Sequence, residues 1–188
     1  MNSKVGILLS GRGSNMMSLV EASRAPASHY EVALIASDKP DAAGIAWAKT
    51  QRLATWAQSP KGIGKPAYEA ALDAALRDAQ VETIALAGYM RLLSDDFVAR
   101  WRGRILNIHP SLLPKYKGLD THVRAIAAGD THGGCSVHIV TEELDGGEVL
   151  GQAEVPILPG DTPDALAARV LAQEHRLYPR TLAEFVIR

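Results

Sequence analysis

The strand, turn and helix that decide the fold lie in residues 5–20, which read Val5-Gly6-Ile7-Leu8-Leu9-Ser10-Gly11-Arg12-Gly13-Ser14-Asn15-Met16-Met17-Ser18-Leu19-Val20. The apolar run before Ser10 has the length and continuity of a buried parallel strand. The glycines that follow are typical of a tight turn, and a helix begins near Met16. A strand followed by a glycine turn and a helix is the opening of a doubly wound α/β sheet.

The segments that follow repeat this alternation of buried strand and helix. Apolar runs predict strands at residues 32–36, 54–57, 83–87 and 104–109, and composition and periodicity predict helices at residues 43–51, from 65 onward and at 94–101. Together these elements predict a mostly parallel, Rossmann-like sheet for the N-terminal half.

The pattern changes after Pro110. Residues 110–133 surround one short helical stretch at 122–128, and a connection of this length is a candidate active-site loop. Residues 134–140 and 148–156 alternate as strands, which we expect to add a mixed or antiparallel section to the sheet.

The last helix carries a carboxylate among apolar residues. It begins at Thr162-Pro163, and we expect it to end near Tyr178, because Pro179 lacks the amide hydrogen that a helix interior needs. Glu174 follows Val170 by four residues and shares its inward stripe. The sequence leaves two interpretations of Glu174 open, a solvated residue at the helix edge or a contact to a ligand.

The whole chain of 188 residues is expected to form a single domain. Twenty basic and 21 acidic residues give a formal charge of −1, so we expect neither nucleic acid nor a membrane surface as a partner. The N-terminus runs directly into a strand without a signal-peptide pattern, which favours a cytoplasmic location. Cys135 is the only cysteine, and His132-x-x-Cys135-x-x-His138 places the thiol and His138 on opposite strand faces, so we expect no metal site.

The turn at Gly11–Asn15 is a candidate phosphate site. Gly13 allows close approach of the backbone, while Ser14 and Asn15 add side-chain donors at a helix N-terminus. A dinucleotide site is less compatible, since the third glycine of its fingerprint falls at Met16 and Ser37 stands where an acidic residue would end the second strand. A plain tight turn remains the alternative.

Asn107, His109 and Asp145 are the candidate catalytic residues. Asn107 and His109 are two apart on a strand that stops at Pro110, so their side chains share a face at the carboxyl end, where ligands bind in open α/β sheets. An amide, an imidazole and a carboxylate suit acyl transfer through a tetrahedral intermediate without a nucleophilic Ser or Cys. A strand ending in a turn, with Asp145 in an Asp-Gly-Gly turn, is the alternative.

The turn after the fourth strand offers weaker candidates. An arginine such as Arg91 most often forms a surface ion pair, although it suits an acidic ligand. Met90, Leu92 and Leu93 are more typical of core than of a pocket wall.

The motifs taken together resemble the folate-dependent formyltransferases, and among them the phosphoribosylglycinamide formyltransferases of purine synthesis. The resemblance rests on six segments in compatible order and spacing: Gly11–Asn15, Ala87–Leu93, Asn107–Pro114, Ser136–His138, Glu143–Gly147 and Gln173–His175. The Asn-x-His-Pro and Asp-Gly segments indicate the superfamily, and the Gly-x-Gly-Ser-Asn loop indicates the member.

This resemblance implies a formyltransferase fold and a role for each segment. It implies that residues of about 1–100 bind the substrate glycinamide ribonucleotide, called the ribotide below. It also implies that residues of about 101–188 hold the catalytic and folate-binding groups. The implied ribotide contacts are Gly13, Ser14, Asn15 and Glu174, and the implied catalytic set is Asn107, His109 and Asp145. The implied folate contacts are Met90, Arg91, Leu92, Leu93, Asn107, Thr141, Glu142, Glu143, Leu144 and Asp145, with Lys65 at a position where relatives can carry a folate-contacting arginine.

The implied reaction moves the formyl group of 10-formyltetrahydrofolate, as co-substrate and without a metal, to the amine of glycinamide ribonucleotide. The substrates are small molecules, and the enzyme is expected to be a monomer or a homodimer. A formyltetrahydrofolate hydrolase, a sugar-nucleotide formyltransferase and a non-catalytic nucleotide-binding module remain alternatives.

Overall fold

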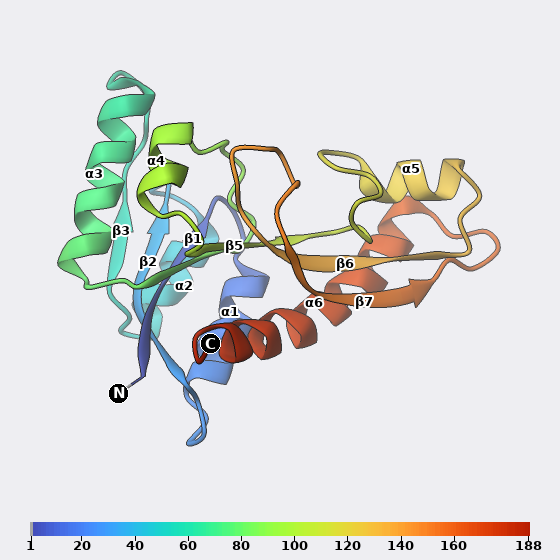
Figure 1. Cartoon of the computed structure of the whole chain (residues 1–188), viewed down its shortest axis with the longest axis horizontal. Helices are drawn as coiled ribbons and strands as arrows, with labels where there is room; N and C mark the ends of the chain where they lie inside the picture. Colours follow the sequence, from blue (N-terminus) through green and yellow to red (C-terminus); the bar gives the residue numbers. More distant parts are fainter. Residues whose placement is uncertain (1) are drawn as a thin grey trace.

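A computed structural model describes residues 2–188 as one seven-stranded sheet with helices on both faces (Figure 1). The strand order is β3-β2-β1-β4-β5-β6-β7. The strands are β1 (Ser3–Leu9), β2 (Tyr30–Ser37), β3 (Thr55–Ala57), β4 (Thr83–Leu86), β5 (Ile105–His109), β6 (His132–Ile139) and β7 (Val149–Pro156). β1 to β5 pair in parallel, and β6 and β7 are antiparallel, so the predicted doubly wound sheet with mixed C-terminal strands is confirmed.

Six helices cover the sheet. They are α1 (Ser14–Ser23), α2 (Ala43–Thr50), α3 (Gly64–Asp78), α4 (Asp95–Arg100), α5 (Thr121–Ala127) and α6 (Pro163–Phe185). Val5, Ile7 and Leu9 of β1 pack with α1, α2 and α6, whereas Leu8 packs with α3 and α4. This alternation is the period of a strand that is buried on both faces, which explains its continuous apolar sequence.

Helix α6 does not end near Tyr178 as predicted but continues through Pro179 to Phe185. Pro179 removes one backbone hydrogen bond, yet Thr181 and Leu182 beyond it are buried. The hydroxyl of Tyr178 donates to the backbone carbonyls of Leu86 and Leu106, both at 3.1 Å. Packing of this last section against the core therefore outweighs the local preference of proline to end a helix.

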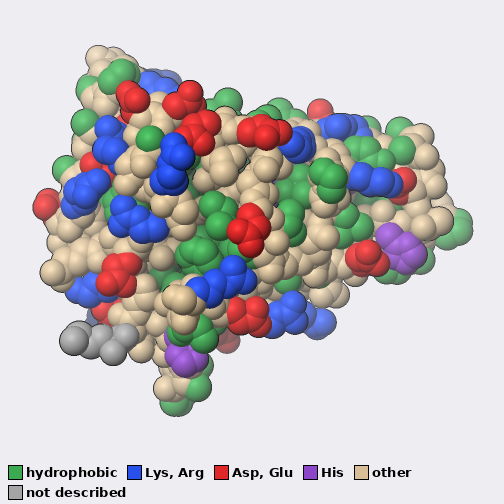
Figure 2. Space-filling view, viewed as in Figure 1, with side chains coloured by type: hydrophobic (Ala, Val, Ile, Leu, Met, Phe, Trp, Pro, Cys, Tyr) green, Lys and Arg blue, Asp and Glu red, His purple; other side chains and the backbone are tan. Residues whose placement is uncertain are grey.

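Strand order reverses around β1 and β4, which leaves a crevice at the carboxyl ends of these strands. On the face shown in Figure 2, side chains of both charges are interspersed. Within residues 2–188, no helix is long and apolar enough to cross a membrane.

Candidate active site

A cavity of about 1140 Å³ lies at the carboxyl ends of the central strands. It brings together segments that are far apart in sequence, as the resemblance implies. Predicted site residues that line it are Asn15, Lys65, Met90, Arg91, Leu92, Leu93, Asn107, His109, Thr141, Glu142, Glu143, Leu144, Asp145 and Glu174. Gly13 and Ser14 adjoin this set in the chain but are not among the lining residues.

Asp145 lies at the centre of the polar groups. Its Oδ2 is 3.4 Å from Nδ1 of His109, and its Oδ1 is 3.5 Å from Nε2 of His138. The backbone amide of Gly118 donates to Oδ2 at 2.9 Å. One carboxylate thus connects β5, β6 and the 110–120 loop.

The surroundings of Asp145 favour its ionised form. Burial alone raises the pKa of a carboxyl group, but the contact with His138, the amide of Gly118 and the nearby imidazoles outweigh burial, so the pKa of Asp145 lies below its ordinary value. The carboxylate therefore carries a negative charge at neutral pH.

His109 ends β5 and is buried. Its Nε2 lies 2.9 Å from the backbone carbonyl oxygen of Tyr116, which only accepts hydrogen bonds, so Nε2 carries a proton. Its Nδ1 faces the carboxylate of Asp145. Both ring nitrogens thus face acceptors, so each is placed to donate a hydrogen bond when it carries a proton.

Asn107 and His138 form the other half of the centre. β5 and β6 pair antiparallel with Asn107 opposite His138, and the two side chains approach to 3.2 Å between Nδ2 and Nε2. Sequence reasoning assigned His138 no catalytic role, because its place in the site depends on the register between β5 and β6. The available signal was the Ser136–His138 segment, which the resemblance includes.

The predicted phosphate loop leads into α1. Gly13 caps this helix with φ of 79°, a left-handed conformation that favours glycine. Nδ2 of Asn15 donates to Oε2 of Glu174 at 2.7 Å, while Oδ1 of Asn15 is buried without a hydrogen-bond partner in the described chain. The side-chain donor that the sequence assigned to phosphate is thus directed at Glu174 in this structure.

Glu174 is only 7% exposed, so the interpretation as a solvated edge residue is wrong. Burial raises the pKa of its carboxyl group, and the hydrogen bond from Asn15 offsets part of that rise. A buried carboxylate that lines the cavity is placed to accept hydrogen bonds from a ligand.

Met90 and Leu92 of the Met90–Leu93 turn form an exposed apolar wall, whereas Leu93 is partly buried against the core cluster, as the sequence predicted, and also lines the cavity. Met90 is 69% exposed and Leu92 is 71% exposed, and both line the cavity, which corrects the expectation that they are buried. The turn lies between β4 and α4, and the side chains of Met90 and Leu92 face the cavity. The guanidinium of Arg91 lies 5.6 Å from the ring centroid of Tyr68 rather than in the expected surface ion pair.

Lys65 lines the same cavity at the start of α3, with its Nζ 4.0 Å from Oε1 of Glu69.

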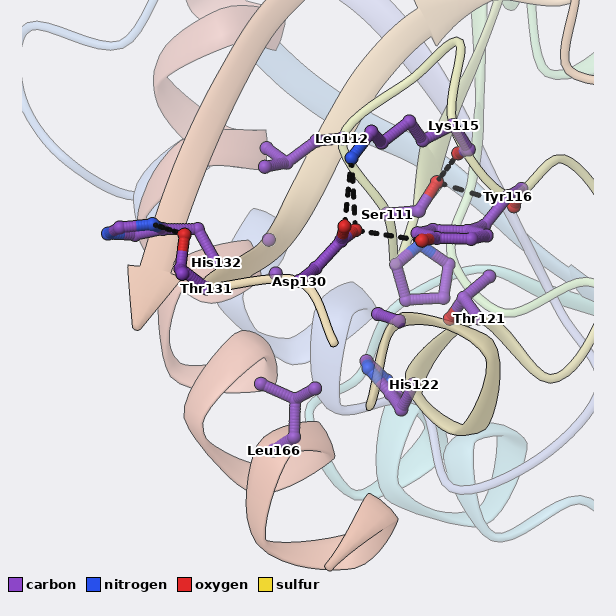
Figure 3. Close-up of a pocket in the computed structure, with 14 residues that line it drawn as sticks. Ser111, Leu112, Lys115, Tyr116, Thr121, His122, Asp130, Thr131, His132 and Leu166 are labelled. Atoms are coloured by element: carbon purple, nitrogen blue, oxygen red, sulfur yellow. Dashed lines mark hydrogen bonds and ion pairs between the residues drawn. The ribbon is translucent and has the colours of Figure 1, made fainter. Parts of the chain in front are cut away.

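A second cavity of about 340 Å³ is lined in part by the same 110–122 segment (Figure 3). Asp130 anchors this segment: its carboxylate accepts from Nζ of Lys115 at 3.0 Å and from the hydroxyl of Tyr116 at 2.8 Å. His122 lines both cavities. The loop that brings the Tyr116 carbonyl to His109 is therefore tied to the start of β6.

The other sites considered from the sequence have different environments. Cys135 lies in the core, where burial raises the pKa of its thiol to about 12, and His138 faces the cavity. Within residues 2–188, no three His, Cys, Asp or Glu side chains are arranged to hold a metal ion. Asp38 follows β2 but is buried and accepts from Ser10 Oγ at 2.6 Å, so it is not placed as a dinucleotide ribose acceptor.

The family model described as "Formyl transferase" matches residues 3–182. This chain belongs to the formyl transferase family. A solved structure of phosphoribosylglycinamide formyltransferase from Brucella melitensis is 50% identical, with a TM-score of 0.94 over 99% of this chain and 96% of that chain. Phosphoribosylglycinamide formyltransferase of Escherichia coli is 42% identical over 95% of this chain and 85% of its own length.

Larger family members include the same region. The trifunctional purine biosynthetic protein adenosine-3 of Drosophila melanogaster is 44% identical over 97% of this chain, which spans 14% of the length of that protein. The formyl transferase region is thus a small part of that relative.

Proposed function

We propose that this chain transfers the formyl group of 10-formyltetrahydrofolate to the amine of N1-(5-phospho-D-ribosyl)glycinamide in purine biosynthesis. The observation that carries the proposal is the convergence of Asn107, His109 and Asp145 in one cavity, which the Asn15–Glu174 pair and the Met90–Leu93 wall also line. Family membership and the names of the two formyltransferase relatives support it.

The ribotide occupies the Asn15–Glu174 side, within the part of the chain that we assign to residues of about 1–100 together with α6. Backbone amides of the Gly13–Asn15 turn and the positive end of the α1 dipole bind the phosphate, and Ser14 adds a hydroxyl donor. Glu174 accepts hydrogen bonds from the ribose hydroxyls. The Nδ2 donor of Asn15 holds that carboxylate in place.

The folate occupies the other side. Met90, Leu92 and Leu93 cover the flat ring system with apolar surface, and Leu144, which is also exposed in the cavity, faces it from the Thr141–Asp145 segment. Arg91 and Lys65 supply positive charge at the same end of the cavity, which suits the carboxylates of a folate tail.

In the proposed reaction the amine nitrogen bonds to the formyl carbon, and the bond from that carbon to the folate nitrogen breaks. Asn107 and His109 donate hydrogen bonds to the oxyanion. For this, the formyl oxygen takes the place of the Tyr116 carbonyl as the acceptor for Nε2 of His109. One such donor contributes on the order of 3 kcal/mol. Asp145 holds the imidazolium and orients a water that carries the amine proton to the departing nitrogen.

The proposal involves two small-molecule substrates and needs neither nucleic acid nor membrane. We place the enzyme in the cytoplasm as a monomer or a homodimer.

The test is incubation of the purified chain with 10-formyltetrahydrofolate, with and without the ribotide. We expect formylated ribotide and tetrahydrofolate in equal amounts only when both substrates are present. Formate release without the ribotide would instead indicate a hydrolase. If 10-formyltetrahydrofolate is not consumed in either incubation, the result would indicate a non-catalytic nucleotide-binding module.

A further inference from the structure

Ser10 connects the phosphate loop to the folate wall through its side chain. It follows β1, directly precedes Gly11, and is 3% exposed. Its Oγ donates to Oδ1 of Asp38 at 2.6 Å and accepts from the backbone amide of Met90 at 2.9 Å. A hydroxyl has a single hydrogen, so donation to Asp38 directs its lone pairs to the Met90 amide.

Asp38 fixes the orientation of this hydroxyl. It follows β2, is buried, and takes no part in the proposed chemistry. Because a carboxylate only accepts, it forces Ser10 to be the donor in their hydrogen bond. A hydroxyl that donates to a charged acceptor is itself polarised and becomes a better acceptor for the next donor in the chain.

The segment that Ser10 holds has little other regular structure. Residues 87–93 follow β4 without forming a helix or strand, and Gly88 has φ of 78°. Backbone hydrogen bonds attach the first two residues of the segment to β1 and Ser10: the Ala87 amide donates to the Leu8 carbonyl at 2.8 Å, and the Ser10 amide donates to the Gly88 carbonyl at 3.0 Å. Further along, Met90 is held by the Ser10 hydroxyl. Without the hydroxyl, the Met90 amide would lose this acceptor, at the point of the segment that carries the apolar wall.

We propose that Ser10 and Asp38 are positioning residues, which set the Met90–Leu93 wall at the distance from the phosphate loop that a bound folate requires. This inference rests on the proposed function, because it assigns the wall to the folate. It predicts that loss of the Ser10 hydroxyl affects folate binding selectively.

The test compares Ser10→Ala and Asp38→Asn with the wild type, and uses calorimetry with tetrahydrofolate and, separately, with the ribotide. Ser10→Ala is expected to raise the Kd for tetrahydrofolate about 5- to 10-fold, the equivalent of one hydrogen bond, and to change the Kd for the ribotide less than 2-fold. Asp38→Asn keeps an acceptor for the hydroxyl, so its Kd for tetrahydrofolate should stay within about 2-fold of wild type.

Ser23→Ala is the matched control, because Ser23 is a partly buried hydroxyl that bonds only within α1. It should leave both Kd values unchanged. If Ser10→Ala does not fold, Asp38→Ala replaces it, with an expected rise of about 3-fold for tetrahydrofolate alone.

The positioning role is overturned if Ser10→Ala raises the Kd for both ligands equally, or if it leaves the Kd for tetrahydrofolate unchanged. A wild-type protein that binds tetrahydrofolate but transfers no formyl group overturns the proposed reaction. The comparison of Ser10→Ala with wild type still tests whether Ser10 positions the Met90–Leu93 wall for folate binding. A wild-type protein that does not bind tetrahydrofolate overturns both.

Discussion

At the scale of single residues, Asp145 is explained both by turn chemistry and by catalysis. It has φ of 47°, a left-handed conformation that Asp and Asn adopt more readily than most residues. The same carboxylate contacts His109 and His138 and accepts from Gly118. The two explanations differ in the importance of its charge, which a substitution can remove without changing the turn.

We predict that Asp145→Asn lowers kcat by roughly 100-fold or more and leaves the protein folded, because asparagine keeps the backbone conformation and loses the charge that holds the imidazolium. Steady-state kinetics and thermal unfolding provide the measurement. Asp161→Asn is the control, since Asp161 pairs with Arg169 outside the cavity and should affect Tm alone. Near-normal turnover in Asp145→Asn would return this residue to a structural role.

Glu174 leads to a prediction about pH. Its pKa is raised in the fold, so the fold favours the protonated form. The stability from this group is fully present below the unfolded pKa of about 4.3 and is lost as pH rises through the raised folded pKa. Glu174→Gln cannot ionise, so this loss of stability at high pH does not occur, and the glutamine side-chain oxygen can still accept the hydrogen bond from Asn15.

Glu174→Gln should therefore have a higher Tm than wild type at pH 7–8, and the difference should disappear near pH 4. Thermal unfolding across this range is the measurement. A difference in Tm that stays constant with pH would show that Glu174 is not destabilised by its charge.

At the scale of elements, the turn between β1 and α1 depends on Gly13. A Cβ at this position would lie 2.9 Å from Cε of Met16 and 3.2 Å from Cα of Gly44, in a left-handed backbone. At Gly11, a Cβ would meet nothing within 4 Å. A side chain is therefore expected to be tolerated at Gly11 but not at Gly13, although both glycines belong to one turn.

We expect Gly13→Ala to reduce the free energy of unfolding by about 1–3 kcal/mol, and to weaken binding of the ribotide more than binding of the folate. Gly11→Ala should leave stability nearly unchanged. Denaturant unfolding and calorimetry with each ligand measure the two effects. Equal stability of the two variants would contradict the steric argument at Gly13.

Helix α6 contains prolines in two different settings. Pro163 stands at the first helical position, where a missing amide hydrogen costs nothing, whereas Pro179 lies in the interior. We predict that Pro179→Ala raises the free energy of unfolding by about 1–2 kcal/mol, because it restores a donor to the helix, offset by greater freedom of the unfolded chain. Pro163→Ala should bring no gain, and an equal effect of the two substitutions would contradict this explanation.

At the scale of the whole molecule, the sequence predicted the sheet because each buried strand is a continuous apolar run that ends in a turn. It also predicted that Asn107 and His109 meet in the cavity, since strand period and position at a carboxyl end are local properties. The exposed Met90 and the central His138 could not be predicted in this way, because their places depend on which elements pack or pair with them over long distances. Tertiary packing likewise decided the length of α6.

The division into a ribotide side and a folate side stays a prediction about the whole cavity. Segments from both halves of the chain line the cavity, since Glu174 lies beside Asn15 and Thr141–Asp145 lines it together with Met90–Leu93. The two binding sites are therefore expected to form only in the complete fold.

The central claim is that His109 acts on the transition state of formyl transfer, and His109→Ala tests it most directly through kcat with both substrates saturating and Kd for each substrate. We predict a fall in kcat of roughly 100-fold or more with both Kd values within about 3-fold of wild type, since an oxyanion donor acts on charge that develops during reaction. His132→Ala, an exposed histidine outside this cavity, should leave kcat unchanged. A normal kcat in His109→Ala with only weakened binding would contradict the claim.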